Sequence, residues 1–136
     1  MILTDAGPLV ALLDGDDPHH PRCLTVAQRL PPSPLLTTWP CFTGAMYLLG
    51  EVGGYRYQAT LWNLRRTGRL ILHDLAPEEI DRMAVLMEKY QDTPMDLADA
   101  SIVAVAETRS LRRVFTIDTA FRVYRLSDGS ALEVLP

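Results

Sequence analysis

The stretch from Pro94 to Glu107 constrains the fold of this chain more than any other part of the sequence. It carries two aspartates, Asp96 and Asp99, followed by residues that are almost all apolar or small. A helix that is apolar on every side has to lie inside the protein, because water does not tolerate such a surface. Asp96 and Asp99 are three residues apart, so they share one face at the buried N-terminal end of this helix.

Two interpretations of this acidic pair stay open at the level of the stretch itself. In the first, Asp96 is the N-cap of the helix and Asp99, at the third helical position, complements the helix dipole. In the second, the two carboxylates belong to a functional site. The positions of the other acids along the chain bear on the choice.

The size and composition predict one globular domain spanning residues 1–136. With 48% hydrophobic and 22% charged residues, the chain has the composition of an ordinary soluble protein. Cys23 and Cys41 form no disulfide framework and fit a reducing cytosol. The chain reaches Asp5 at once and contains no apolar run long enough for a membrane span, so we expect neither a signal peptide nor a membrane anchor, and a cytoplasmic location.

Short apolar segments alternate with amphipathic or apolar helical patterns along the whole chain. Such an alternation predicts an α/β fold with a central, mainly parallel sheet covered on both faces. We expect strands at 1–4, 35–38, 70–72, 113–117 and 131–135. The expected helices cover 6–13, 19–30, 39 to a stop at Gly50 or Gly53-Gly54, 55–66, 77–90 and the central stretch, with a short one from Asp118 through Tyr124.

Three acids fall where a parallel sheet brings chain segments together. Asp5 directly follows the first strand and Asp118 the fourth, while Asp99 lies at the mouth of the central helix. Each aspartate by itself is more often a helix cap. Strand-to-helix junctions of a parallel sheet nevertheless lie at one edge, where ligands bind. Crowded carboxylates repel one another, and a hard cation such as Mg²⁺ or Mn²⁺ removes that repulsion. The sequence therefore predicts metal-dependent phosphoryl transfer or hydrolysis.

The segments around these acids resemble PIN domains, and most of all the VapC-type ribonuclease toxins. The resemblance rests on Thr4-Asp5-Ala6-Gly7-Pro8, on Asp96-Leu97-Ala98-Asp99-Ala100 leading a helix of small residues, and on Thr116-Ile117-Asp118. It implies a three-layer α/β/α domain with about five strands and a Mg²⁺- or Mn²⁺-dependent endoribonuclease activity. Asp5, Asp99 and Asp118 match three of the family's acids, Thr116 matches a supporting hydroxyl residue, and Asp96 is an auxiliary ligand or orienting group.

The chain departs from the family pattern at Gly44. The family usually carries a glutamate early in the helix after the second strand, and that place falls on Gly44 here. A glycine inside a helix costs about 1 kcal/mol relative to alanine, so nothing local favours it. Glu51 lies seven residues further along, about 10 Å away on a helix, and is a poor substitute. We therefore expect weak metal binding and reduced or absent cleavage.

The basic residues suggest where RNA would approach. The net charge is −4, yet the cations are twelve arginines and one lysine. A planar guanidinium suits phosphate, although a GC-rich genome produces the same bias. Between Thr108 and Ser127 there are five arginines and one acid. The candidates for RNA contact are Arg112, Arg113, Arg122 and Arg125.

The resemblance further implies a homodimer, a cognate antitoxin, and a structured RNA substrate such as tRNA. Two other classes of function remain as alternatives. The first is a non-catalytic PIN scaffold that binds antitoxin or RNA, which Gly44 favours. The second is a receiver domain or a haloacid-dehalogenase-like phosphatase, which pairs its acids with a lysine after a late strand. The single lysine, Lys89, lies inside an amphipathic helical segment and argues against that class.

Overall fold

A computed structural model describes all residues, 1–136. Its elements alternate as the sequence pattern predicts. In chain order they are β1 (Ile2–Thr4), α1 (Ala6–Leu13), α2 (His20–Arg29), β2 (Leu35–Thr38), α3 (Trp39–Gly53), α4 (Tyr55–Arg66), β3 (Leu70–His73), α5 (Pro77–Lys89), α6 (Leu97–Thr108), β4 (Arg113–Phe115), the short 3₁₀ helix η1 (Thr119–Arg122) and β5 (Glu133–Leu135).

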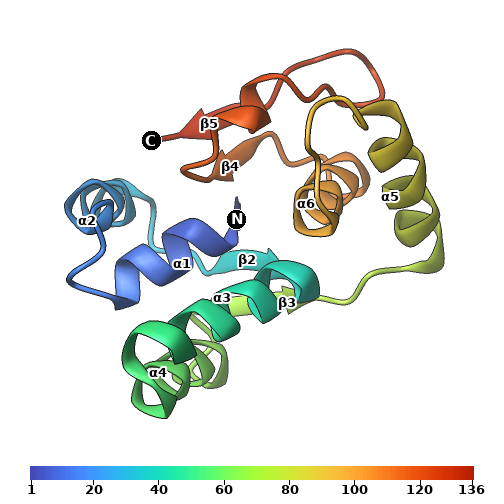
Figure 1. Cartoon of the computed structure of the whole chain (residues 1–136). Coiled ribbons are helices and arrows are strands. Elements are labelled where there is room, and N and C mark those ends of the chain that lie inside the picture. Colours follow the sequence, from blue (N-terminus) through green and yellow to red (C-terminus); the bar gives the residue numbers. More distant parts are fainter.

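The five strands form one sheet in the order β3-β2-β1-β4-β5, and every neighbouring pair is parallel. This confirms the expected α/β class and strand number. Because all strands run the same way, the junctions after β1, β2 and β4 lie at one edge of the sheet. In Figure 1 the strands cross the middle of the molecule, with α5 and α6 on one side and α1 and α2 on the other.

Side chains that alternate along the strands build the two faces of the sheet. Leu3 of β1 belongs to the large core cluster formed with α5 and α6, whereas Ile2 packs with Ala11 of α1 and Cys23 of α2. A further cluster joins α1, α3 and α4 to β3, as Leu70 illustrates. Helices therefore cover both faces of the sheet, which gives the three layers expected.

The central helix α6 is buried as the sequence requires. All seven residues from Ala100 to Ala106 are buried, and the helix begins at Leu97 with Asp96 as its N-cap. No helix of this chain combines the length and the apolar character that crossing a bilayer demands.

Several boundaries differ from the expected ones. Strands β4 and β5 are shorter than expected, and the segment after Asp118 is a 3₁₀ helix that ends at Arg122 rather than at Tyr124. Helix α3 continues through Gly50, and the amide of Gln58 from α4 occupies the space that a side chain at position 50 would need and donates to the carbonyl of Met46. The helix ends at Gly53, where Gly54 takes a left-handed backbone with φ of 69°.

Candidate metal and nuclease site

Asp5 is held at the junction between β1 and α1. Its side chain caps α1, because Oδ1 accepts a hydrogen bond of 2.8 Å from the amide of Ala6. The other oxygen, Oδ2, accepts a 2.9 Å hydrogen bond from the hydroxyl of Thr116. Asp5 is 8% exposed, so both bonds fix a carboxylate that has little access to solvent.

Asp118 is linked to Asp5 through Thr116. The amide of Asp118 donates a 3.0 Å hydrogen bond to the Thr116 hydroxyl, which in turn donates to Asp5. Oδ1 of Asp118 accepts from the amide of Ala120 at 2.9 Å and so caps η1. The Asp118 side chain is exposed, and its second oxygen makes no hydrogen bond within the protein.

Asp99 and Asp96 occupy the first turn of α6. The amide of Asp99 donates a 2.8 Å hydrogen bond to Oδ1 of Asp96, so Asp96 caps the helix as the structural interpretation requires. The carboxylate of Asp99 is 4% exposed, and its Oδ2 accepts a 2.9 Å hydrogen bond from the hydroxyl of Tyr124. Capping thus occupies Asp96, whereas Asp99 points its carboxylate into the protein.

The pKa values of Asp99 and Asp5 show that the charges of the neighbouring carboxyl groups act on them. The pKa of Asp99 is raised from 3.8 to about 7, chiefly by burial and also by the negative charges of Asp96, Asp5 and Asp118, against the lowering effect of the Tyr124 hydroxyl. Burial also raises the pKa of Asp5, with a smaller contribution from Asp118, although the Ala6 amide and the Thr116 hydroxyl act in the opposite direction. The acids therefore form one electrostatic group with uncompensated negative charge.

The donor set suits a hard cation held by few direct ligands. The oxygens Oδ1 of Asp99 and Oδ2 of Asp118 accept no hydrogen bond and remain available. No three His, Cys, Asp or Glu side chains lie close enough together to bind one ion directly. Mg²⁺ is commonly bound by one or two carboxylates, with water and substrate completing its shell. The arrangement fits that mode better than direct coordination by all three aspartates.

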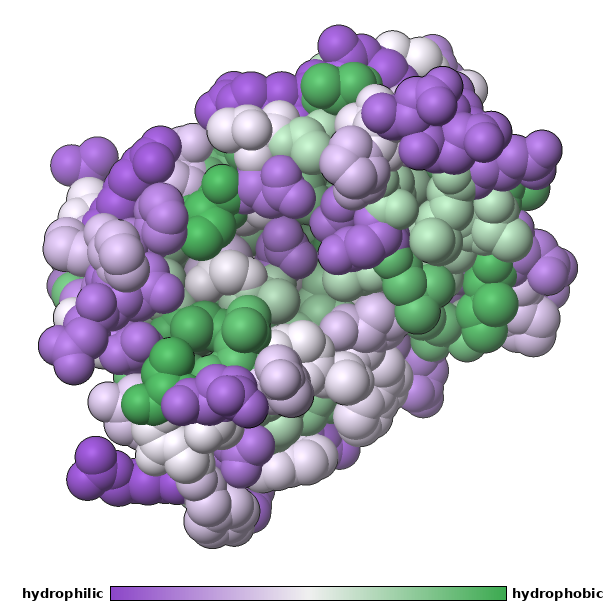
Figure 2. Space-filling model, viewed as in Figure 1, coloured by the Kyte–Doolittle hydropathy of each residue, from purple (hydrophilic) through white to green (hydrophobic).

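Figure 2, in the same view as Figure 1, shows hydrophilic and hydrophobic residues side by side in the middle of this face. His19 and His20 take no part in the site. The ring of His20 instead contacts the carbonyl oxygen of Ala11 at 2.6 Å.

Sequence reasoning did not single out two residues that contact the acids. The thiol of Cys41 lies 3.6 Å from Oδ1 of Asp5 and 3.8 Å from the carbonyl oxygen of Ala98, so Cys41 of α3 links the junction between β1 and α1 to the first turn of α6. Burial and the charge of Asp5 raise the pKa of Cys41 to about 12, so the thiol stays protonated and donates. The second residue is Tyr124, and no sequence motif distinguishes either side chain from an ordinary core residue.

Gly44 lies on α3 beside the start of α1. A Cβ atom built at this glycine would lie 3.8 Å from the Cβ of Ala6, which is an ordinary contact. Position 44 therefore accepts a side chain and directs it toward the residue next to Asp5. Glu51, on the same helix, is exposed and makes no hydrogen bond or ion pair.

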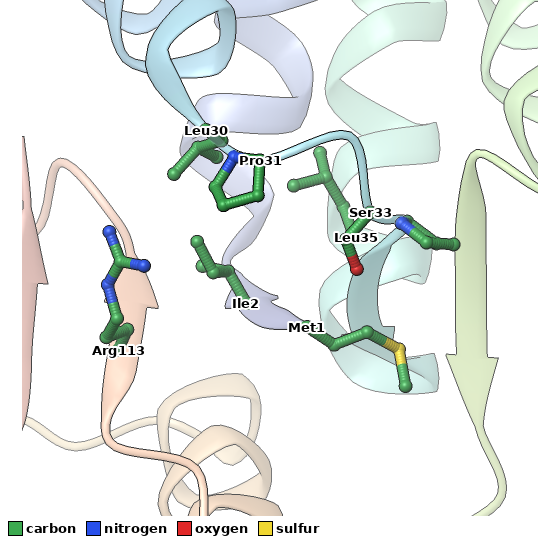
Figure 3. Close-up of a pocket in the computed structure, with 8 residues that line it drawn as sticks. Met1, Ile2, Leu30, Pro31, Ser33, Leu35 and Arg113 are labelled. Atoms are coloured by element: carbon green, nitrogen blue, oxygen red, sulfur yellow. The ribbon is translucent and has the colours of Figure 1, made fainter.

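The four candidate arginines are divided between two regions. Arg113 begins β4 and lies with Met1, Ile2 and Leu30 at the amino edge of the sheet, opposite the acids (Figure 3). Arg112 precedes it and pairs with Asp128 at 3.3 Å. Neither residue flanks Asp118, because the length of the strand separates them from it.

Arg122 and Arg125 lie on the side of the acids. The guanidinium of Arg125 donates to the carbonyl oxygens of Arg122, Val123 and Tyr124, which occupies one of its terminal nitrogens in holding the loop. Arg122 lines a cavity together with Asp118.

Comparison with known proteins gives structural matches only. No protein-family model matches the sequence, and no curated protein matches it either. Among solved structures, Mycobacterium tuberculosis VapC20, described as a Sarcin-Ricin loop cleaving toxin, superposes over 100% of both chains with a TM-score of 0.85 and 18% identity. A toxin–antitoxin complex from Klebsiella pneumoniae covers 88% of each chain at TM-score 0.66 and 18% identity. FitAcB from Neisseria gonorrhoeae covers 100% of this chain and 97% of its own at TM-score 0.65 and 18% identity.

The fold is therefore that of the PIN-domain proteins of toxin–antitoxin systems, as the sequence resemblance implies.

Proposed function

We propose that this chain is a Mg²⁺- or Mn²⁺-dependent endoribonuclease of the VapC type whose cleavage is impaired by Gly44. The observation that carries the proposal is the link between the acids: Thr116 bonds Asp5 and the amide of Asp118, and the pKa of Asp99 is raised in part by both of their charges. The match to VapC20 over the whole chain supports the same class of activity.

The proposed roles follow from the contacts. Asp5, Asp99 and Asp118 hold the divalent ion, directly or through water, and Asp96 orients the first turn of α6. The bound ion supplies a water of lowered pKa and stabilises negative charge on a phosphodiester. The hydroxyl of Thr116 keeps Asp5 and Asp118 at a fixed separation. Tyr124 and Cys41 hold the carboxylates of Asp99 and Asp5, so that little side-chain freedom is lost when the ion binds.

A second candidate function is a PIN scaffold that binds an antitoxin or RNA without cutting it. Two observations favour it. Position 44 carries a glycine instead of an acid, and no three His, Cys, Asp or Glu side chains lie close enough together to hold a metal ion. Without a fourth carboxylate, the remaining acids hold a divalent ion weakly. In this case the acidic pocket binds cationic side chains of a partner.

We also propose that the chain pairs with a cognate antitoxin and forms a homodimer in the cytoplasm. Helices α3 and α4 carry large aromatic side chains that are 39–74% exposed, a surface that a monomer seldom leaves open. They are Trp39, Tyr47, Tyr55 and Trp62.

Restoring the acid at position 44 tests the nuclease proposal. We expect Gly44→Glu to raise Mn²⁺ affinity by roughly 10–100-fold, the range observed when a group that supports a metal site is lost or regained. Calorimetric titration measures the affinity, and a panel of structured RNAs, tRNA included, measures cleavage. Gly44→Gln has the same shape without the charge, and Thr43→Glu places the same charge on the exposed face of α3.

The outcomes separate the two functions. Gain of metal affinity and cleavage in Gly44→Glu alone supports the impaired nuclease. Equal behaviour of Gly44→Glu and Gly44→Gln refutes the assignment of position 44 to the site. A chain that binds RNA or antitoxin, and that neither binds Mn²⁺ nor cuts RNA even as Gly44→Glu, is the scaffold.

A further inference from the structure

A small cavity beside the acids is lined by two arginines that come from distant parts of the chain. Arg22 lies in the first turn of α2 and Arg122 at the end of η1. Both line a cavity of about 50 Å³ whose wall includes Thr116 and Asp118. Asp118 is itself one of the acids, and Thr116 donates to Asp5, so the cavity directly adjoins the acidic group.

Both guanidinium groups are free of partners within the protein. Neither Arg22 nor Arg122 takes part in an ion pair, and neither side chain donates a hydrogen bond. Both residues are exposed. This contrasts with Arg82, Arg112 and Arg125, each of which uses its guanidinium to hold another part of the fold.

The position of Arg22 is hard to explain by stability. It occupies the third residue of α2, where the helix dipole favours an acid, and a cation there costs about 0.3–1 kcal/mol. The segment before α2 holds three acids, Asp14, Asp16 and Asp17, and none of them makes an ion pair with Arg22. A positive charge at this place is therefore better accounted for by something that binds there.

We propose that Arg22 and Arg122 form a subsite for a backbone phosphate of single-stranded RNA, adjacent to the phosphate that is cut at the acids. The inference rests on the proposed function for the identity of the polymer. The cavity is small, about 50 Å³, and its lining by two arginines and two threonines suits a phosphate group. Two guanidinium forks that face a phosphate from different elements bind it in a defined orientation and offset the repulsion from the acidic group.

The subsite predicts the path of the bound strand over the protein surface. A phosphate in this cavity lies beside Thr116 and Asp118, so the neighbouring linkage extends toward Asp5 and Asp99. The strand then runs from the α2–η1 side of the molecule toward the mouth of α6. Arg112 and Arg113 have no part in this path, because they lie at the opposite edge of the sheet.

Binding of labelled RNA tests the subsite without requiring cleavage. The full chain carrying Asp5→Asn, in the presence of a chelator, is titrated against a fluorescent oligouridylate of roughly 12 nucleotides at several salt concentrations. We expect Arg22→Ala and Arg122→Ala each to weaken binding about tenfold, the loss of one charge-assisted hydrogen bond. Each should also reduce the slope of log K against log salt by about 0.7.

Arg113→Ala is the matched control, since it removes one exposed arginine from the other edge of the sheet. Thermal melting checks the fold, and Arg22→Ala should melt no lower than its parent because the removed charge opposes the dipole of α2. The subsite is overturned if the Arg22 and Arg122 variants bind as Arg113→Ala does, or if the parent does not bind the RNA. Loss of affinity and slope in both variants, with no cleavage by Gly44→Glu, leaves the subsite standing and removes the nuclease proposal.

Discussion

The raised pKa of Asp99 makes a prediction about stability that does not depend on metal or RNA. Burial, together with the charges of neighbouring acids, takes the pKa of this carboxyl from 3.8 to about 7, so the folded protein binds the Asp99 proton more tightly than the unfolded chain does. The stability that the group contributes is fully present below the unfolded pKa. It is lost as the pH rises through the folded pKa near 7. Without metal, the protein should therefore be less stable at pH 8 than at pH 5.

The size of the effect follows from the shift. At about 1.36 kcal/mol per pH unit, a rise from 3.8 to about 7 sets a ceiling of about 4 kcal/mol over the whole titration, of which about 3 kcal/mol falls between pH 5 and pH 8. Part of the shift comes from the charges of Asp96, Asp5 and Asp118 rather than from burial, so we expect about 1–2 kcal/mol from Asp99 itself. In a domain of this size that corresponds to roughly 3–8 °C in melting temperature.

Asp99→Asn isolates this contribution. Asparagine keeps the size of the side chain and an oxygen that can accept from the Tyr124 hydroxyl, but it does not ionise. We expect the variant to be more stable than the parent at pH 8 and no more stable at pH 5, as measured by urea unfolding in the presence of a chelator. Asp92→Asn, at an exposed aspartate without hydrogen bonds, is the control. Equal stability of the parent at the two pH values, or an Asp99→Asn loss that is constant with pH, refutes the reasoning.

Two further predictions concern contacts around the site. Tyr124→Phe removes the hydroxyl that donates to Asp99 at 2.9 Å, so it should lower the free energy of unfolding in urea by about 1–2 kcal/mol at pH 8. The variant should also bind Mn²⁺ more weakly. Unchanged metal affinity would mean that the hydroxyl does not position Asp99. Gly7→Ala places a Cβ 2.7 Å from Cγ1 of Ile117, so it should destabilise the protein by about 1–3 kcal/mol. Adding Ile117→Ala to the same chain should recover part of that loss. A Gly7→Ala variant as stable as its parent would show that the contact between α1 and Ile117 can relax.

The elements that carry the site could be predicted because local and global signals agree in them. Leu3 and Ile2 belong to a run too apolar to be exposed, and Asp5 then ends the strand and caps the next helix. The same agreement holds for the apolar body of α6 behind its Asp96 cap. Parallel pairing of β1 with β4 then places Asp5 and Asp118 at one edge, which a sequence argument can reach by topology alone.

What the sequence could not supply is which side chains meet across elements. Tyr124 contacts Asp99 from 25 positions away, and Cys41 contacts Asp5 from 36 positions away. Nothing in the local pattern of either residue signals a polar partner, because buried tyrosine and cysteine are common in cores. Residues that are close in sequence can also lie far apart in the fold. Arg113 and Asp118 are five positions apart, but the strand β4 between them places them at opposite edges of the sheet.

The structural and functional interpretations of the acids prove to be compatible. Asp5 and Asp118 each use Oδ1 to cap the element that follows, through Ala6 and Ala120, and Asp96 caps α6 in the same way. A carboxylate has two oxygens and about four acceptor positions, so a cap consumes only part of its capacity. The capping bond also fixes the plane of the carboxylate and hence the direction of the remaining oxygen. Under the proposed function, a change that removes one of these caps should therefore weaken metal binding as well as the helix that it caps.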